Sequence, residues 1–358
     1  MICIPDTMRA VRCYGPGDYR LETLPVPEPG ADEILVQVEA CGVCASDGKC
    51  FGGAPLFWGD ATRPQFVQPP VTPGHELIGR VVALGAGAEA QGLRVGDRAI
   101  SEQIVPCWKC RYCRRSNYHL CVEADVYGFR RRVQGAMADY MIFPAGSLNH
   151  KVPEELPRDQ AALMEPLACS LRAVERSRMQ LGDVVVVAGA GTLGLGMVAF
   201  ARLRNPGLLI SIDRLAPRLE LARALGADLA IDPGAENAVQ RVLDLTEGYG
   251  CDVYIEATGH PDAVNQGLAM IRKGGNFVEF SVMPRETTCD WTLIGDAKEI
   301  NIYGAHLGPH LYPTVIDYLA RGLVKVDGIV TDALPLEDYA EGFDRVHRGI
   351  GIKTLLVP

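Results

Sequence analysis

The chain has 358 residues, which is too many for one ordinary hydrophobic core, so we expect two domains. Its hydrophobic content of 48% and charged content of 22% are typical of a globular protein. With 35 Lys and Arg against 44 Asp and Glu the net charge is −9, which argues against non-specific binding to nucleic acid or to acidic membranes.

No segment has the pattern of a membrane span or of an export signal. No run approaches about 18 apolar residues, and residues 1–8 lack the basic and apolar regions of a signal peptide. Met8 begins a strand-like run, so residues 1–7 are interpreted as an extension or a mis-assigned start. We therefore expect a cytoplasmic protein whose 12 cysteines stay reduced.

The first part of the chain is predicted to be β-structure. Short apolar runs alternate with turn residues over residues 8–40, and the segment 33–39 ends in period-two alternation. Similar runs recur at residues 74–84 and 94–100. Many short strands with few helical periods indicate a small β-barrel-like domain.

Two short motifs in this region contain candidate metal ligands. Cys44 follows the 33–39 run, and Gly74, His75 and Glu76 lie further along. A thiol, an imidazole and a carboxylate can hold a catalytic zinc, because three protein ligands leave one position for water or substrate. The alternative is a Cys44 that packs on a turn and an ordinary surface histidine.

Residues 51–70 form an aromatic segment rich in Gly and Pro. The segment is too irregular for a helix, so we expect a loop over the candidate site. A role in the substrate pocket and ordinary loop packing are both open at this point.

A cluster of four cysteines predicts a second, structural metal site. Cys107, Cys110, Cys113 and Cys121 have C-x2-C-x2-C-x7-C spacing, and four thiolates bind Zn²⁺ at about 2.3 Å. Two disulfides or four unrelated core cysteines are the alternatives. Both are disfavoured, because there is no export signal and the segment is polar. A closed four-thiolate site has no open position, so it would stabilise a lobe of about residues 103–125 without doing chemistry.

From residue 159 the pattern changes to helix. We expect Pro166 to interrupt this helix and to displace Glu165 from regular helical geometry. A buried strand of consecutive valines then leads into Gly189-x-Gly191-x-x-Gly194, which opens an apolar helix. In this strand–turn–helix context the glycines predict a pyrophosphate-binding turn.

Asp213 ends the next strand, where a carboxylate can accept hydrogen bonds from the adenosine ribose. It would repel a 2′-phosphate, so NAD is favoured over NADP, although the neighbouring Arg214 could receive such a phosphate. Helices and strands alternate up to residue 303, which predicts a doubly wound parallel sheet. Two further helices and a closing strand at 352–357 are expected to return to the first domain.

This succession of features resembles the zinc-dependent medium-chain dehydrogenase family over essentially the whole chain. The matching motifs are Gly42-Val-Cys44-x-Ser46-Asp47, Gly74-His75-Glu76, the four cysteines, Glu165-Pro166-Leu167 and the glycine-rich turn. The resemblance implies an α/β fold with a doubly wound parallel (Rossmann) coenzyme domain at residues 159–304. It implies a discontinuous GroES-like β-barrel catalytic domain at 1–158 and 305–358, and a homotetramer or homodimer.

The resemblance also implies the roles of individual residues. Cys44 and His75 would bind the catalytic zinc, and Glu76 and Glu165 would bind it directly or through its water. Ser46 would pass on the alcohol proton, and Asp47 would support His75. The implied cofactors are two zinc ions per chain and NAD. The residues expected to bind the cofactor are Gly189, Gly191, Thr192, Leu193, Gly194, Asp213, Arg214, Arg218, Phe280, Val282 and His306.

Departures from the family pattern bear on the substrate. The Glu-Pro-Leu motif resembles the polyol and threonine dehydrogenase branch, but Lys49 and Cys50 stand where the sorbitol type has His and Tyr. No Arg or Lys lies between Lys298 and Arg321, where those branches bind substrate with an Arg at the place of Leu307. A buried carboxylate without a partner is costly, so we expect a neutral polyol of four or five carbons, such as erythritol, threitol or xylitol.

Other readings of the sequence stay open. A sorbitol, other alcohol or threonine dehydrogenase of the same family is one alternative. A zinc-free reductase would lack the Cys44, His75 and Glu165 set. A non-catalytic nucleotide-binding protein would bind NAD without reducing it.

Overall fold

The computed structural model describes residues 3–358 and consists of two compact units. The first unit extends to Glu165 and includes Tyr312–Arg321 and Val330–Pro358, whereas the second comprises Pro166–Leu311 and Gly322–Ile329. Residues 1–2 of the expected N-terminal extension lie outside the described residues. Within residues 3–358, no helix has the length and hydropathy needed to cross a membrane.

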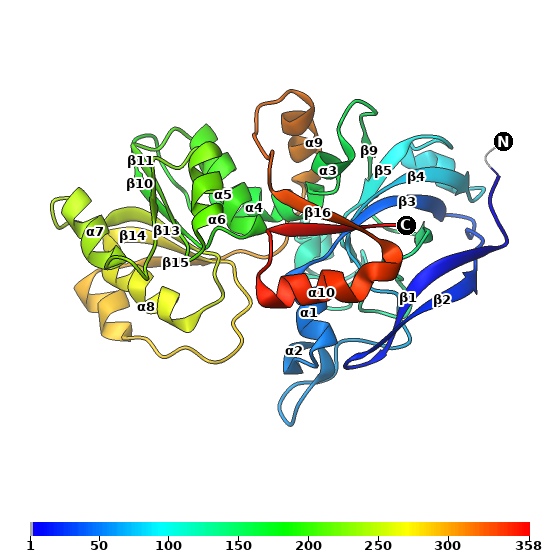
Figure 1. The fold of residues 1–358 in the computed structure, drawn as a ribbon, viewed down its shortest axis with the longest axis horizontal. Coiled ribbons are helices and arrows are strands. Elements are labelled where there is room, and N and C mark those ends of the chain that lie inside the picture. Colours follow the sequence, from blue (N-terminus) through cyan, green and yellow to red (C-terminus); the bar gives the residue numbers. More distant parts are fainter. Residues whose placement is uncertain (1–2) are drawn as a thin grey trace. The chain divides into compact units, whose positions relative to one another are not determined.

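Antiparallel strands form most of the first unit (Figure 1). Its strands are β1 (Thr7–Gly15), β2 (Asp18–Pro25), β3 (Ile34–Gly42), β4 (Glu76–Leu84), β5 (Arg98–Ser101), β6 (Ile104–Val105), β7 (Asp125–Val126), β8 (Tyr140–Phe143), β9 (Asn149–Val152), β16 (Val330–Pro335) and β17 (Lys353–Val357). The main sheet has the order β16-β17-β3-β4-β5-β9, and β8 also pairs with β3. The closing strand β17 therefore lies beside β3, although the two are far apart in the sequence.

Short helices connect and cover these strands. They are α1 (Ala45–Phe51), α2 (Pro55–Trp58), η1 (Ala88–Gln91), η2 (Cys113–Arg115), η3 (Tyr118–Leu120), α3 (Arg158–Ala161), α9 (Tyr312–Ala320), η5 (Leu336–Asp338) and α10 (Tyr339–Arg348). The expectation that residues 51–70 contain no helix was wrong, because α2 lies within them. Pro55 is at its N-terminus, where the fixed φ of proline suits a helix and its missing N–H costs nothing.

Glu165 lies in the first turn of α4 (Met164–Arg176). The expectation that Pro166 would displace it from regular helical geometry was therefore wrong. The break in the helical segment instead falls between α3 and α4. Pro166 is tolerated in the first turn because the backbone N–H groups there have no intrahelical partner.

The second unit contains the predicted doubly wound parallel sheet, of order β12-β11-β10-β13-β14-β15. Its elements are β10 (Val184–Ala188), α5 (Thr192–Leu203), β11 (Leu208–Ile212), α6 (Ala216–Ala224), β12 (Leu229–Ile231), α7 (Ala238–Leu245), β13 (Cys251–Glu256), α8 (Pro261–Met270), β14 (Ile271–Glu279), η4 (Leu293–Ala297) and β15 (Asn301–Gly304). Helices α5 and α6 cover one face and α7 and α8 the other (Figure 1), as right-handed crossovers require when the strand order reverses at β10.

Candidate active site

Cys44 lies between the end of β3 and the start of α1, where it is the N-cap residue. Its backbone N–H donates to Oδ2 of Asp47 at 2.9 Å, and the N–H of Asp47 donates to the carbonyl of Cys44 at 3.1 Å. These reciprocal bonds satisfy backbone groups that the first turn of a helix leaves unpaired. They hold the Cys44 thiol at the N-terminus of α1.

His75 and Glu76 lie at the start of β4, opposite the end of β3. Glu76 is paired in register with Gly42. Gly74 has a φ of +100°, and a Cβ there would approach Sγ of Cys41 to 2.5 Å. Only glycine suits this backbone and this space, so Gly74 is required for the turn that brings His75 next to Cys44.

Cys44, His75 and Glu76 form a cluster whose ligand atoms lie within 4.8 Å of one another. Beside them, Oγ of Ser46, Oδ1 of Asp47 and Nδ1 of His75 are buried and have no hydrogen-bond partner among the described residues. Buried polar atoms are rarely left unpaired. A thiolate, an imidazole and a carboxylate in this arrangement fit the donor set of a catalytic zinc ion.

The charge balance of the cluster also suits a cation. Nδ1 of His75 lies 3.7 Å from Oδ1 of Asp47, which is longer than a hydrogen bond. Burial lowers the pKa of His75, but the Asp47 carboxylate and the Cys44 thiolate oppose this and raise the pKa well above its usual range. The acidic surroundings therefore favour a positive charge at this place, which a metal ion would supply while leaving the imidazole neutral.

Glu76 is held by a lysine that the sequence analysis did not identify. Nζ of Lys353, on β17, lies 2.5 Å from Oε2 of Glu76 and donates to the carbonyl of Val43 at 3.1 Å. Both side chains of the pair are buried. A lysine at the start of the closing strand, just before the apolar residues 355–357, was the available sequence signal.

Glu165 is held by Gln103, which is bonded in turn by Tyr312, and the sequence analysis identified neither residue. Nε2 of Gln103 donates to Oε1 of Glu165 at 2.5 Å, and the hydroxyl of Tyr312 donates to Oε1 of Gln103 at 2.8 Å. All three residues are buried. No motif marks Gln103 or Tyr312, because their relation to Glu165 exists only in the folded chain.

Two aromatic residues of the 51–70 segment, Phe57 and Phe66, pack on Phe129, which lies next to His75. The ring of Phe57 stacks on Phe129 at 5.1 Å, and Phe129 lies 5.6 Å from the His75 ring. Nε1 of Trp58 donates to the carbonyl of Cys50 at 2.7 Å. The Phe57 side chain is only 6% exposed, so its role is ordinary core packing.

The four cysteines of the lobe converge as their spacing predicts. The sulfurs of Cys107, Cys110, Cys113 and Cys121 lie within 4.8 Å of one another, and four ligands at about 2.3 Å from one ion would be about 3.8 Å apart. None of them forms a disulfide. The backbone N–H of Cys113 stabilises the Cys110 thiolate, which lowers the pKa of Cys110 to about 6. The lobe thus fits one zinc ion without an open position.

The glycine-rich turn lies in the second unit, between β10 and α5. A Cβ at Gly194 would lie 1.8 Å from the carbonyl oxygen of Gly189, whereas the nearest atom to a Cβ at Gly191 would be Arg218 Nη1 at 3.8 Å. Gly194 is therefore needed for helix–strand packing. Gly191 leaves open space at the N-terminus of α5, as a turn that approaches a pyrophosphate requires.

Asp213 directly follows β11 and lies beside the same turn. Its Oδ2 accepts from the N–H of Ala190 at 2.7 Å and its Oδ1 from the N–H of Leu215 at 2.9 Å. Thr192 and Leu193 begin α5, and Arg214 is exposed. Phe280 and Val282 follow β14 and His306 follows β15, so all three lie past the carboxyl ends of parallel strands, as does the turn.

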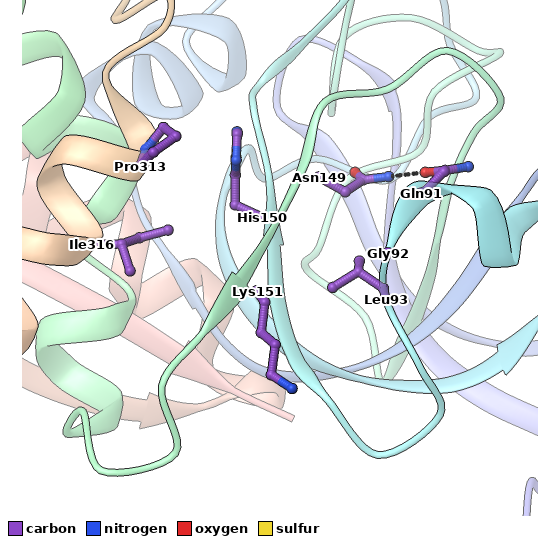
Figure 2. Close-up of a pocket in the computed structure, with 8 residues that line it drawn as sticks. All are labelled: Gln91, Gly92, Leu93, Asn149, His150, Lys151, Pro313 and Ile316. Carbon is purple, nitrogen blue, oxygen red and sulfur yellow. Dashed lines mark hydrogen bonds between the residues drawn. The ribbon is translucent and has the colours of Figure 1, made fainter.

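Figure 2 shows a pocket in the first unit. It has a volume of about 350 Å³ and is lined by Gln91, Gly92, Leu93, Asn149, His150, Lys151, Pro313 and Ile316. None of the metal-ligating residues proposed from the sequence contributes to its wall.

Comparison with known proteins decides the family. The alcohol dehydrogenase GroES-like domain matches residues 30–154, and the zinc-binding dehydrogenase domain matches residues 192–321. An erythritol/L-threitol dehydrogenase of Mycolicibacterium smegmatis is 48% identical over 99% of this chain and 99% of its own length. The chain belongs to the zinc-type alcohol dehydrogenase family.

More distant members of the zinc-type alcohol dehydrogenase family also match along the whole chain. A D-arabitol-phosphate dehydrogenase of Enterococcus avium is 33% identical over 98% of this chain and 97% of its own length. A solved structure from Sinorhizobium meliloti 1021, described as a zinc-binding dehydrogenase bound to NADP, has a TM-score of 0.89 at 28% identity and covers 99% of this chain and 100% of its own.

Membership of the zinc-type alcohol dehydrogenase family makes the chain an oxidoreductase. It confirms the resemblance stated from the motifs, together with the α/β fold that combines a Rossmann sheet with a GroES-like domain.

Proposed function

We propose that the protein oxidises a secondary alcohol of a neutral four- or five-carbon polyol to the ketone, with zinc and NAD as cofactors. The convergence of Cys44, His75 and Glu76 within 4.8 Å carries the proposal. The similarity to an erythritol/L-threitol dehydrogenase supports the substrate class.

The residues of the candidate site would have two roles, metal binding and proton transfer. Cys44 and His75, with Glu76 or Glu165, would hold the zinc. When bound, zinc would supply Lewis acidity towards a hydroxyl, and NAD would accept the hydride that leaves the alcohol carbon. Oγ of Ser46 would take the hydroxyl proton and pass it on, because a hydroxyl both donates and accepts.

NAD and a structural zinc in the four-cysteine lobe would complete the set of cofactors. The glycine-rich turn would receive the pyrophosphate, and Asp213 would select NAD through the ribose hydroxyls. Arg214, Arg218, Phe280, Val282 and His306 are proposed as further cofactor contacts. The four-cysteine lobe would hold a second, structural zinc. The assembly is expected to be a homodimer or homotetramer and the location cytoplasmic.

The absence of Arg and Lys between Lys298 and Arg321 supports a neutral substrate. A substrate with a carboxylate or a phosphate would need a cationic partner in its site. This argues against threonine and against a phosphorylated polyol.

The test is a panel of three- to six-carbon polyols, with threonine and a phosphorylated polyol as charged comparisons. Reduction of NAD and of NADP is followed by absorbance, and Cys44→Ala serves as the inactive control. We expect NAD reduction with erythritol, threitol or xylitol. Turnover of the charged substrates alone, or full activity in Cys44→Ala, would contradict the proposal.

A further inference from the structure

Hydrogen bonds and one peptide linkage connect the four-cysteine lobe to Glu165 within the first unit. At the lobe, the N–H of Cys121 donates to the carbonyl of Tyr118 at 3.0 Å. The hydroxyl of Tyr118 donates to Oε2 of Glu102 at 2.7 Å. The next residue along the chain, Gln103, donates to Glu165 at 2.5 Å.

A second route reaches Gln103 from the other oxygen of Glu102. Nε2 of His150 lies 3.1 Å from Oε1 of Glu102. The His150 ring stacks on Tyr312, with centroids 5.5 Å apart and planes 17° apart. The hydroxyl of Tyr312 then donates to Oε1 of Gln103. Both oxygens of Glu102 and both ends of the Gln103 amide are thus engaged.

This arrangement allows one orientation of Gln103. An ionised carboxylate can only accept, so the amide NH2 of Gln103 faces Glu165 and the amide oxygen faces the Tyr312 hydroxyl, which donates to it. Gln103, Glu102 and Tyr118 are each 2% exposed and Tyr312 is fully buried, so water does not compete for these bonds. Fully satisfied buried networks of this kind rigidify the groups they contain.

We propose that Gln103 is a positioning residue for Glu165, and that the four-cysteine lobe maintains this position through Tyr118 and Glu102. The lobe would then influence the geometry of the catalytic metal without contacting it. This inference rests on the proposed function, because it assigns Glu165 to the Cys44 metal site.

The test compares substitutions of four buried side chains, those of Tyr312, Gln103, Tyr118 and Tyr127. Tyr312→Phe removes only the hydroxyl that donates to the amide oxygen of Gln103 and keeps the ring that stacks on His150. Gln103→Met removes both bonds of the amide. Tyr127→Phe is the matched control, because Tyr127 is equally buried but its hydroxyl bonds Ser101, at 3.0 Å, rather than Gln103.

Each protein is loaded with Co²⁺, and the visible bands that depend on Cys44 are obtained as the difference from a Cys44→Ala preparation. We expect Tyr312→Phe and Gln103→Met to shift these bands and to lower kcat about tenfold with little change in KM for the polyol, because the metal geometry changes. Tyr118→Phe should shift the bands in the same direction, and Tyr127→Phe should leave them unchanged.

The outcomes separate the two proposals. An active wild-type enzyme whose bands and kcat are the same in Tyr312→Phe, Gln103→Met and Tyr127→Phe would overturn the positioning role alone. A wild-type protein without Cys44-dependent bands would overturn the proposed catalytic metal, and the positioning role with it. If Gln103→Met does not fold, the more conservative Tyr312→Phe decides whether Gln103 positions Glu165.

Discussion

Nζ of Lys353 and Oε2 of Glu76 lie 2.5 Å apart, and the two side chains are 4% and 2% exposed. The pair joins the last strand of the chain to the start of β4, beside Cys44 and His75. Removing one partner of a buried ion pair leaves the other charge uncompensated, which costs more than the pair itself contributes. Lys353 therefore holds the Glu76 side chain in place at the start of β4.

We expect Lys353→Met to destabilise the metal-free protein by about 3–5 kcal/mol, because Glu76 would become an unpaired buried charge. Adding Glu76→Gln should recover part of this loss. Denaturant unfolding of the single and double variants measures both effects. Lys151→Met is the control, since Lys151 pairs with Asp97 while 62% exposed and should cost less than about 1 kcal/mol. Equal effects of the two lysine substitutions would contradict the prediction.

Metal analysis should find about two zinc ions per chain, one at each cluster. Cys44→Ala should retain about one zinc and most of the thermal stability while losing activity. Cys113→Ser should also retain about one zinc but lower the thermal midpoint, because a structural zinc stabilises its lobe. Unchanged zinc content in either variant would exclude the corresponding site.

The glycines of the nucleotide turn are expected to respond differently to an added methyl group. Gly191→Ala should fold normally but weaken NADH binding at least about tenfold, because its Cβ would occupy the space left for the pyrophosphate. Gly194→Ala should lower stability itself, since its Cβ would collide with the Gly189 carbonyl. NADH fluorescence titration measures the loss of binding in Gly191→Ala, and thermal unfolding measures the loss of stability in Gly194→Ala. Normal NADH affinity in Gly191→Ala would rule out a pyrophosphate at this turn.

Asp213→Asn should reduce the preference for NAD over NADP about tenfold or more, because the charge that repels a 2′-phosphate is lost. The amide oxygen can still accept one of the two backbone bonds that Asp213 makes. kcat/KM with each cofactor measures the effect. Asp232→Asn, at the end of the neighbouring strand β12, is the control and should leave the preference unchanged. A similar shift in both variants would exclude a specific ribose contact by Asp213.

Glu279 and Glu256 are direct register partners on β14 and β13. Burial, reinforced by the Glu256 charge, raises the pKa of Glu279 to about 7 from 4.5. The folded protein therefore binds the proton more tightly than the unfolded chain, so stability falls as the pH rises from about 4.5 to about 7. The full pKa shift of Glu279 corresponds to about 3 kcal/mol of folding free energy. Because Glu279 is partly exposed to solvent, we expect an effect of about 1–2 kcal/mol.

Glu279→Gln should accordingly raise the thermal midpoint at pH 8 and leave it nearly unchanged at pH 4.5, where wild-type Glu279 is largely protonated. Thermal unfolding at both pH values tests this. Equal midpoint shifts at both values would contradict a pKa-based effect and indicate a change in packing instead.

Local sequence patterns were enough to predict the parallel sheet and the cluster of four cysteines. The valines before Gly189 and the alternation that follows predicted the parallel sheet, because strands covered on both faces must be apolar throughout. The spacing of the four cysteines predicted their convergence, since so short a segment can bring all four sulfurs to one ion. Cys44, His75 and Glu76 were recognisable because each lies next to a strand end or a glycine turn.

Only the tertiary structure decided what surrounds those motifs. The Lys353 partner of Glu76 and the link from Gln103 and Tyr312 to Glu165 had no local signature. Lys353 lies 277 positions from Glu76 and Tyr312 lies 209 from Gln103. Such contacts arise when distant segments share one sheet and one core, and a single sequence contains no local pattern for which buried polar groups will meet there.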